Sequence, residues 1–316
     1  MSKSEVAVDL LDVRKQIREH SGSVASQKIR ERIIESGMFL CAVFSVAITA
    51  GIVWVLVYES WNFFKNVSII DFLTDTQWTV LFENPRYGIM PLVTGTLVTS
   101  IIALIVALPL GTIIAIYLSE YANSTVREIL KPILELLSAV PTVVFGYFAL
   151  LFVTPMLQSV LPELPGFNML SAGIVIGIMI VPYVSSLSED AMKSVPVTIR
   201  EGSYAMGATR VQTALRVLMP AAFSGIASAY VLGFSRAVGE TMVVALAAGT
   251  QPNLTLNPME GAATITAYIV QVSLGDLPHG SVAYQSIFAA GLTLMVMTLV
   301  FNIGGYFLRK RFREVY

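Results

Sequence analysis

The sequence has few of the residues that build metal sites and disulfides. Among its 316 residues it contains one cysteine, Cys41, and two histidines, His20 and His279. One cysteine excludes an intramolecular disulfide and a cysteine-based metal centre, and two histidines are too few for a histidine cluster. The dipeptide Gly-Lys is also absent, so the chain has no G-x-x-x-x-G-K-[ST] loop for ATP phosphates. We therefore expect no metal, no bound cofactor and no catalytic residues in this chain.

Charged residues are also scarce. They make up 13% of the chain, about half of the roughly 25% found in soluble domains. Apolar residues make up 55%, and the mean hydropathy is +0.73. This composition cannot cover a water-exposed surface, which favours a protein embedded in membrane lipid. The net charge of -1 excludes a nucleic-acid partner held by bulk electrostatics.

Six apolar runs reach the about 17–25 residues that a helix needs to cross a bilayer. They lie at Gly37–Tyr58, Leu92–Leu118, Ile133–Gln158, Met169–Leu187, Phe223–Gly249 and Gln285–Leu308. The longest piece outside them is the 36-residue N-terminal tail, and domains below about 40 residues rarely fold alone. We therefore predict an all-α polytopic membrane protein with six transmembrane helices, without a soluble catalytic domain.

Basic residues predict the orientation of these helices. Of the 20 Lys and Arg residues, 17 fall in the tail before residue 37, the loops 119–132 and 188–222, and the tail after residue 308. The intervening loops 59–91, 159–168 and 250–284 contain only Lys65 and Arg86. Because Lys and Arg accumulate on the cytoplasmic side, both termini are predicted to be cytoplasmic, in the inner (plasma) membrane.

The N-terminal tail allows two interpretations. Val6, Leu10, Val13 and Ile17 recur at helical spacing with basic residues between them, as in a helix that lies on the cytoplasmic membrane surface. A solvated, partly disordered tail is an equal alternative. The first apolar run follows charged residues that extend as far as Glu35, so it is expected to remain as an anchor rather than to be cleaved as a signal peptide.

The 188–222 loop is 35 residues long and is predicted to be helical. It runs Glu201-Gly202-Ser203-x-x-x-Gly207, then nine residues, then Val217-Leu218-Met219-Pro220. At these positions it resembles the E-A-A-x-x-x-G motif, with its downstream proline, of the membrane subunits of ABC importers. The resemblance implies that Glu201, Gly202, Ser203, Gly207 and Pro220 belong to a coupling loop that docks on a separate ATPase subunit. Gly207 can adopt a positive φ, which lets two short helices meet at a sharp angle. The alternative is a bracket that only closes the helix bundle.

Two charged residues lie inside the fifth apolar run. Arg236 and Glu240 are four residues apart, so on one helix they share a face and can touch. A charge at the bilayer centre costs about 2.5–3.5 kcal/mol on insertion scales, so both are expected to face the bundle or a wet cavity. They are candidates for the solute path, because Arg offers a planar fork of donors that matches phosphate or carboxylate. The alternative is a self-neutralising structural pair that pins neighbouring helices.

The string Arg236-Ala-Val-Gly-Glu-Thr-Met242 resembles the R-A-x-G-E-T signature of phosphate importer permeases. The Met after Thr is more similar to the PstC type of permease than to its PstA partner. Further similar stretches are Tyr87–Pro91, Gly95–Ser100, Tyr117–Tyr121, Leu134–Pro141 and Ile180–Tyr183. The resemblance covers about residues 37–310.

This resemblance implies a type I ABC importer permease fold and a transporter subunit rather than an enzyme. It implies a second, PstA-like permease, two PstB-like ATPase copies that use ATP and Mg, and an external PstS-like phosphate-binding protein. Arg236 and Glu240 would correspond to charged residues that transport requires. The chain would divide into a cytoplasmic tail 1–36, a first span and periplasmic loop 37–91, a transmembrane domain 92–308 containing the loop 188–222, and a basic tail 309–316.

Three other classes stay open on the sequence. A permease for amino acids, sulfate, molybdate or another small solute would share the coupling motif, and only the Arg-x-x-Gly-Glu string argues against it. A secondary transporter or channel would show an inverted repeat or a run of pore charges, and the sequence shows neither. A membrane enzyme would need catalytic His, Cys or paired carboxylates, of which only Glu240 beside Arg236 is a candidate.

Overall fold

The computed structural model describes residues 3–80, 82, 84–275 and 277–311. Their regular structure is helical, apart from one isolated antiparallel bridge between Trp78 and Tyr87 in the described part of the chain. The chain divides into two units, residues 1–56 and residues 57–316. Residues 312–316 of the predicted basic tail, including Arg313, lie outside the described residues.

Helix α1 (Lys3–Phe64) contains the predicted N-terminal tail and the first predicted span without a break. No proline interrupts this stretch, so every residue after the first turn can donate to the helix ladder. Within α1, the segment Arg30–Phe64 is long and apolar enough to cross a membrane. The described part of the tail is therefore helical, and its helix is continuous with the first span. A position on the membrane surface stays a prediction.

Among the described residues, four helical stretches are long and apolar enough to cross a membrane, or up to six if each of two bent pairs is one span. In the second unit the three unbroken stretches are α3 (Met90–Ile116) with its π-helical extension η1 (Tyr117–Tyr121), α7 (Met169–Lys193) and α14 (Val282–Arg311). Helix α7 continues to Lys193, so the predicted 188–222 loop begins later than expected.

The expectation of one helix over residues 133–158 is wrong. Helix α4 (Ser124–Ala139) ends before Pro141, and the segment formed by α5 (Thr142–Phe148), η2 (Ala149–Val153) and α6 (Thr154–Gln158) leaves it at an angle of 86°. The cause is local, because Pro141 lacks an N–H and forces the preceding residue, Val140, into extended backbone with ψ 130°.

The expectation of one helix over residues 223–249 is also wrong. Helix α11 (Phe223–Val238) ends at Gly239, and a separate short helix, α12 (Met242–Ala247), follows. The remaining elements are α2 (Ile69–Thr74), α8 (Val197–Ala205), α9 (Arg210–Thr213), η3 (Ala214–Leu218), α10 (Met219–Ala221) and α13 (Ile265–Ser273). The segment from α9 to α10 meets α11 at an angle of 77°.

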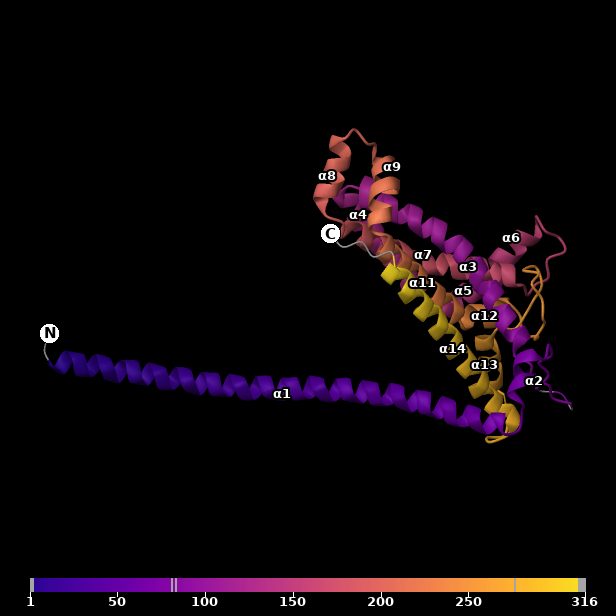
Figure 1. Cartoon of the computed structure of the whole chain (residues 1–316), viewed down its shortest axis with the longest axis horizontal. Coiled ribbons are helices and arrows are strands. Elements are labelled where there is room, and N and C mark those ends of the chain that lie inside the picture. The colour runs from indigo at the N-terminus through magenta and orange to yellow at the C-terminus, as the bar shows by residue number, and fades with distance from the viewer. Residues whose placement is uncertain (1–2, 81, 83, 276, 312–316) are drawn as a thin grey trace. The chain divides into compact units, whose positions relative to one another are not determined.

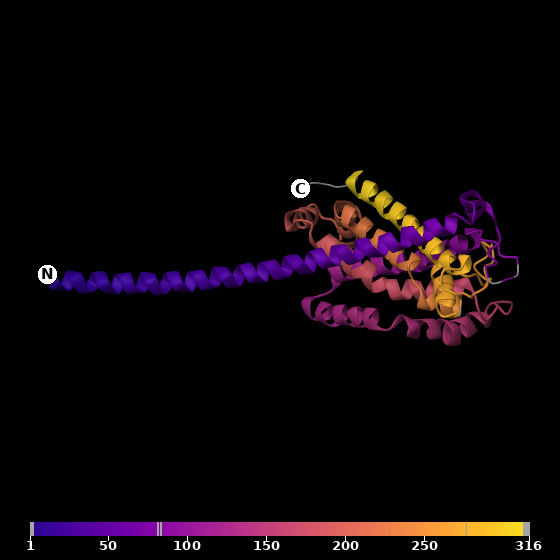
Figure 2. The same cartoon turned by 90° about the horizontal axis from the view of Figure 1, so that it is seen from below.

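Figure 1 shows α8 and α9 at one end of α3 and α7, with α2 and α13 at the other. Figure 2 shows the magenta segment α4–α6 along one side of the second unit and the yellow helix α14 along the opposite side. Glu120 contacts Tyr204 and Arg210, which places the 119–132 loop and the 188–222 loop at the same end of the second unit. The other end carries an aromatic cluster in which Trp78 packs edge-to-face on Tyr87 and Tyr268.

The centre of the second unit is the contact between α3 and α7. It is closed by two glycines of α7, Gly173 and Gly177. A methyl group added to Gly173 would lie 2.6 Å from the Cβ of Ile102, and one added to Gly177 would lie 2.7 Å from the Cβ of Val106. Small residues let membrane helices approach this closely. These two helices therefore form the tightly packed core on which the candidate sites are built.

Candidate functional site

The first candidate site is the 188–222 loop, whose motif residues form a helix–turn–helix. Glu201, Gly202 and Ser203 lie on α8, and Gly207 makes the turn with a φ of +84°, the positive value that the sequence analysis expected. Thr209 begins α9 with a capping box, because its side chain accepts from the N–H of Gln212 and the Gln212 side chain accepts from the N–H of Thr209. Pro220 lies within the short helix α10, before the loop joins α11.

The outward-facing residues of this loop are exposed to solvent. Glu201 and Gly202 are exposed, whereas Ser203 faces inward and its hydroxyl lies 2.9 Å from the hydroxyl of Thr213. The turn also presents apolar side chains to solvent, and Met206 is 89% exposed. An apolar surface on a charged, projecting loop is typical of a protein interaction site. The structure therefore separates the motif into residues that face outward and residues that hold the loop together.

The loop is tied to α3 by a buried acid that the sequence analysis did not select as a site residue. The side chain of Glu120, in η1, is 2% exposed and lies 3.1 Å from Nη2 of Arg200. The Tyr204 hydroxyl donates to its other carboxylate oxygen at 2.9 Å. Burial, and then the hydrogen bond to Glu120, raise the pKa of the Tyr204 phenol, which stays protonated as a donor.

The second candidate site surrounds Arg236, near the end of α11. Its guanidinium lies over the ring of Tyr183, a residue of α7, with 4.2 Å between Cζ and the ring centroid. Its Nε is buried and has no hydrogen-bond partner among the described residues. A guanidinium held by a ring face keeps its planar edge of N–H donors free for another group.

Glu240 does not pair with Arg236, so the expected contact between them is wrong. The helix ends at Gly239, between the two residues, so the i, i+4 geometry is lost. Glu240, which is 7% exposed, instead uses Oε1 to accept from the backbone N–H groups of Met242 and Val243, at 3.1 and 3.4 Å. Its carbonyl oxygen accepts from the hydroxyl of Thr266 on α13, at 2.6 Å. Glu240 therefore caps α12 and joins it to its neighbour.

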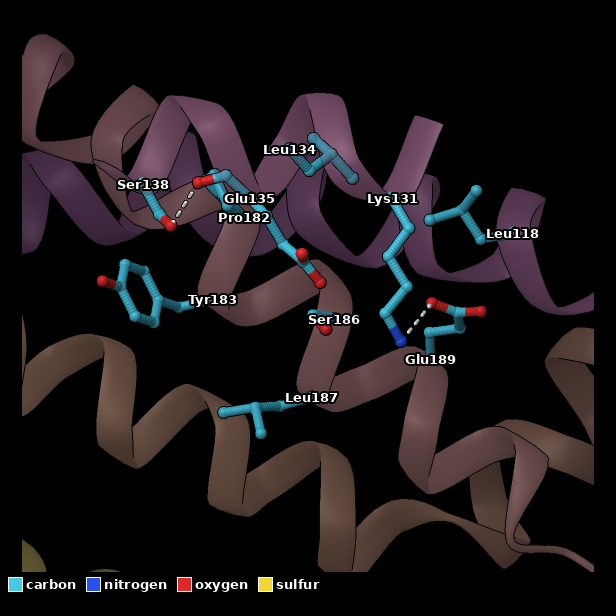
Figure 3. A pocket seen from close by; sticks show the side chains of 10 residues that line it. All are labelled: Leu118, Lys131, Leu134, Glu135, Ser138, Pro182, Tyr183, Ser186, Leu187 and Glu189. Atoms are coloured by element: carbon cyan, nitrogen blue, oxygen red, sulfur yellow. Dashed lines mark hydrogen bonds and ion pairs between the residues drawn. The ribbon is translucent and has the colours of Figure 1, made fainter. Parts of the chain in front are cut away.

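A cavity of about 220 Å³ lies between α4 and α7, and Tyr183 is part of its lining. Figure 3 shows its lining, with Tyr183 at one end and Lys131 reaching Glu189 at the other. The Lys131 amine is occupied twice, because it lies 3.6 Å from Glu189 and 3.1 Å from Asp190. The cavity lining therefore offers no unpaired cation to an anionic solute.

Glu189 itself is a second buried acid that the sequence analysis missed. Its side chain is 0% exposed, and it makes ion pairs with Arg127, Lys131 and Lys193. Arg127 and Lys131 belong to α4, whereas Lys193 is on α7 itself. Three cations offset the cost of burying one carboxylate, and the two on α4 fasten that amphipathic helix to the core. Nothing in the sequence indicated that Glu120 or Glu189 would be buried beside cations, because both lie in segments that were predicted to be loops. Only their contacts in the structure reveal it.

A helical membrane bundle with a short helix–turn–helix projecting from one end is the architecture of an ABC importer permease subunit. The fold is similar to that of a bacterial alginate ABC transporter in complex with its alginate-bound periplasmic protein, with a TM-score of 0.58 at 19% identity, covering 86% of this chain and 96% of that one. It is also similar to the MetNI methionine ABC transporter, with a TM-score of 0.53 at 18% identity, covering 72% and 95%.

The chain belongs to the family described as binding-protein-dependent transport system inner membrane component, which it matches over residues 107–314. It is 36% identical over 276 residues to the probable ABC transporter permease protein YqgH of Bacillus subtilis, covering 87% of this chain and 88% of that one. It is 31% identical to the probable phosphate transport system permease protein PstC of Methanocaldococcus jannaschii, covering 78% and 83%. It is 30% identical to the phosphate transport system permease protein PstC of Mesorhizobium japonicum, covering 85% and 87%.

Membership of this family makes the chain an inner-membrane transporter subunit rather than an enzyme. The expected resemblance to phosphate importer permeases and the expected fold class are thereby confirmed, and so is the expected class of function. Importers of this family work with an ATPase and a substrate-binding protein. The roles of the individual site residues stay predictions.

Proposed function

We propose that this chain is a PstC-type permease subunit of an ATP-driven phosphate importer and forms half of its translocation pathway. The observation that carries the proposal is Arg236, a partly buried cation in the membrane bundle that is not neutralised by Glu240. Its guanidinium rests on Tyr183, and its buried Nε has no hydrogen-bond partner among the described residues. Two N–H groups of a guanidinium match two oxygens of phosphate, which an ammonium group cannot reproduce. The names of the PstC relatives agree with this solute.

Glu240 has a different role in this proposal from the one that the sequence suggested. By capping α12 and holding Thr266, it sets the position of the segment that follows Arg236. We therefore assign to Arg236 the contact with the anion, and to Glu240 the shape of the pathway beside it. A loss of either group is expected to stop transport, but for different physical reasons.

The proposed complex contains a second, PstA-like permease, two PstB-like ATPase subunits and a PstS-like phosphate-binding protein outside. ATP and Mg are used by the ATPase, and this chain binds no cofactor. The ATPase docks on the outward-facing residues of α8, including Glu201 and Gly202. Both termini and the 188–222 loop are cytoplasmic, in accordance with the basic residues that these segments carry.

The test is uptake by liposomes containing this chain, its permease partner and the ATPase, with the binding protein added. Labelled phosphate should enter only with ATP, and excess unlabelled sulfate or molybdate should not compete. Arg236→Gln should abolish uptake. The matched control is Arg309→Gln, because Arg309 is a partly buried arginine on α14 that donates to Ser228 at 3.3 Å, whereas the cation over the Tyr183 ring is Arg236. ATP-driven uptake of sulfate, molybdate or an amino acid without phosphate uptake would overturn the proposal.

A further inference from the structure

Glu120 is the point at which α3 and the coupling loop meet. Its two carboxylate oxygens receive one group each from α8, the Arg200 guanidinium at 3.1 Å and the Tyr204 hydroxyl at 2.9 Å. Its carbonyl oxygen accepts from Nη1 of Arg210, on α9, at 3.5 Å. Both short helices on either side of the Gly207 turn are therefore attached to one residue at the end of α3.

These polar contacts matter because α8 has little else to hold it. None of the described side chains of α8 is buried, and Ile199 packs only partly against the core cluster beneath the loop. A helix held mainly by apolar burial can slide at small cost, whereas an ion pair and a hydrogen bond to one carboxylate restrict that movement. The position of α8 is thus set by the ion pair of Arg200 and the hydrogen bond of Tyr204.

The other end of α3 is equally constrained. Thr96 accepts from the N–H of Ile265 at 3.0 Å, and a methyl group added to Gly95 would lie 2.4 Å from the carbonyl oxygen of Ala263. The 27 residues of α3 span about 40 Å at the usual rise of 1.5 Å per residue. Helix α3 therefore connects Glu120 at one end with the start of α13 at the other, and Glu240 also contacts α13, through Thr266.

We propose that Glu120 is a positioning residue that transmits movement of the coupling loop to α3. It rests on the proposed role of the 188–222 loop in docking the ATPase, and goes beyond it by naming where the movement enters the membrane bundle. Without this attachment, the loop would move with the ATPase while α3 stayed in place. The carboxylate is essential because its charge pairs with Arg200 while its second oxygen accepts from the Tyr204 hydroxyl, whereas glutamine is neutral and has one acceptor oxygen.

The test compares Glu120→Gln with wild type in the purified, reconstituted complex of both permeases, the ATPase and the binding protein. The ATPase should still co-purify, because the outward face of α8 is unchanged. Solute uptake per ATP hydrolysed, and stimulation of hydrolysis by the loaded binding protein, should fall by about 5- to 150-fold, the usual range of coupling between sites. Tyr204→Phe removes one donor at a partly exposed position, and should lower the same ratio in the same direction.

The matched control is Glu189→Gln, because Glu189 is another buried, cation-bound acid at the same end of the bundle. It holds α4 rather than the coupling loop, so it should lower thermal stability while leaving uptake per ATP near wild type. The inference is overturned if Glu120→Gln and Tyr204→Phe keep the wild-type ratio, or if Glu189→Gln lowers it equally. A wild-type complex that imports another solute would refute the phosphate proposal alone, because uptake of that solute per ATP still tests Glu120.

Discussion

The separation of Arg236 from Glu240 makes a quantitative prediction for the double variant Arg236→Gln/Glu240→Gln. If the two charges only neutralised each other, removing both would leave no unpaired charge and should restore function. In the structure they have different partners, Tyr183 for Arg236 and the α12 backbone for Glu240. We therefore expect the double variant to remain unable to take up phosphate, like each single variant.

The expected free energies follow from these partners. Loss of the guanidinium–ring contact should cost about 0.5–2 kcal/mol of stability. Glutamine at position 240 keeps an oxygen that can accept from Met242, so that cost should stay below the about 0.5–2 kcal/mol of a deleted cap. Without a shared partner the two costs should add to within about 0.5 kcal/mol, whereas a contacting pair would show a coupling of about 0.5–3 kcal/mol.

Two assays on the same four proteins test this reasoning. Thermal unfolding of the detergent-solubilised complex gives the coupling between the substitutions, and uptake of labelled phosphate, normalised to membrane abundance, gives function. Arg236→Lys is the companion variant, because it keeps the charge and loses the planar fork, and it should also fail to transport. Uptake near wild type in the double variant would refute the assignment of Arg236 to the solute path.

Three further predictions concern other parts of the chain. With Cys41 replaced, a cysteine at Lys65 should react with a membrane-impermeant thiol reagent in intact spheroplasts, and one at Arg210 should react only after permeabilisation. Gly207→Pro should abolish ATPase co-purification and uptake at normal membrane abundance, because proline fixes φ near about -65° where this residue has +84° and donates to Tyr204; normal uptake would mean that the loop is only a bracket. Gly173→Val should lower stability by about 1–3 kcal/mol through overpacking, measured by thermal unfolding, whereas Gly166→Val, at a position with open space around it, should not.

Hydropathy was sufficient to place the long helices, because each one must bury or expose to lipid nearly all of its length. It failed where a single residue decides the backbone. Pro141 splits the third apolar run, yet prolines 109 and 182 lie inside α3 and α7 without ending them. The different outcome depends on whether neighbouring helices satisfy the freed carbonyl groups, which the sequence does not specify.

The candidate site shows the same division. The helix–turn–helix of the 188–222 loop could be predicted because its residues are close in sequence, and its turn with φ > 0 needs only the glycine at position 207. Glu120 and Glu189 could not, because what makes them special is burial beside cations. The cation nearest to Glu120 is Arg200, 80 positions along the chain, and Glu189 meets Arg127 and Lys131 on another helix. The end of α11 at Gly239 could not be predicted either, because it lies inside an apolar run that continues beyond it. The contact between Arg236 and Glu240 that their spacing favoured is therefore absent.

The contact between α3 and α7 at Gly173 and Gly177 also limits what can pass between these two helices. At Gly173 and Gly177 there is no room for one added methyl group, and hence none for a hydrated ion. The packed contact between α3 and α7 at these glycines therefore leaves no route for a hydrated ion, and a passage there would require the two helices to part. A single copy that has not yet met its partner subunits should not conduct ions between these two helices.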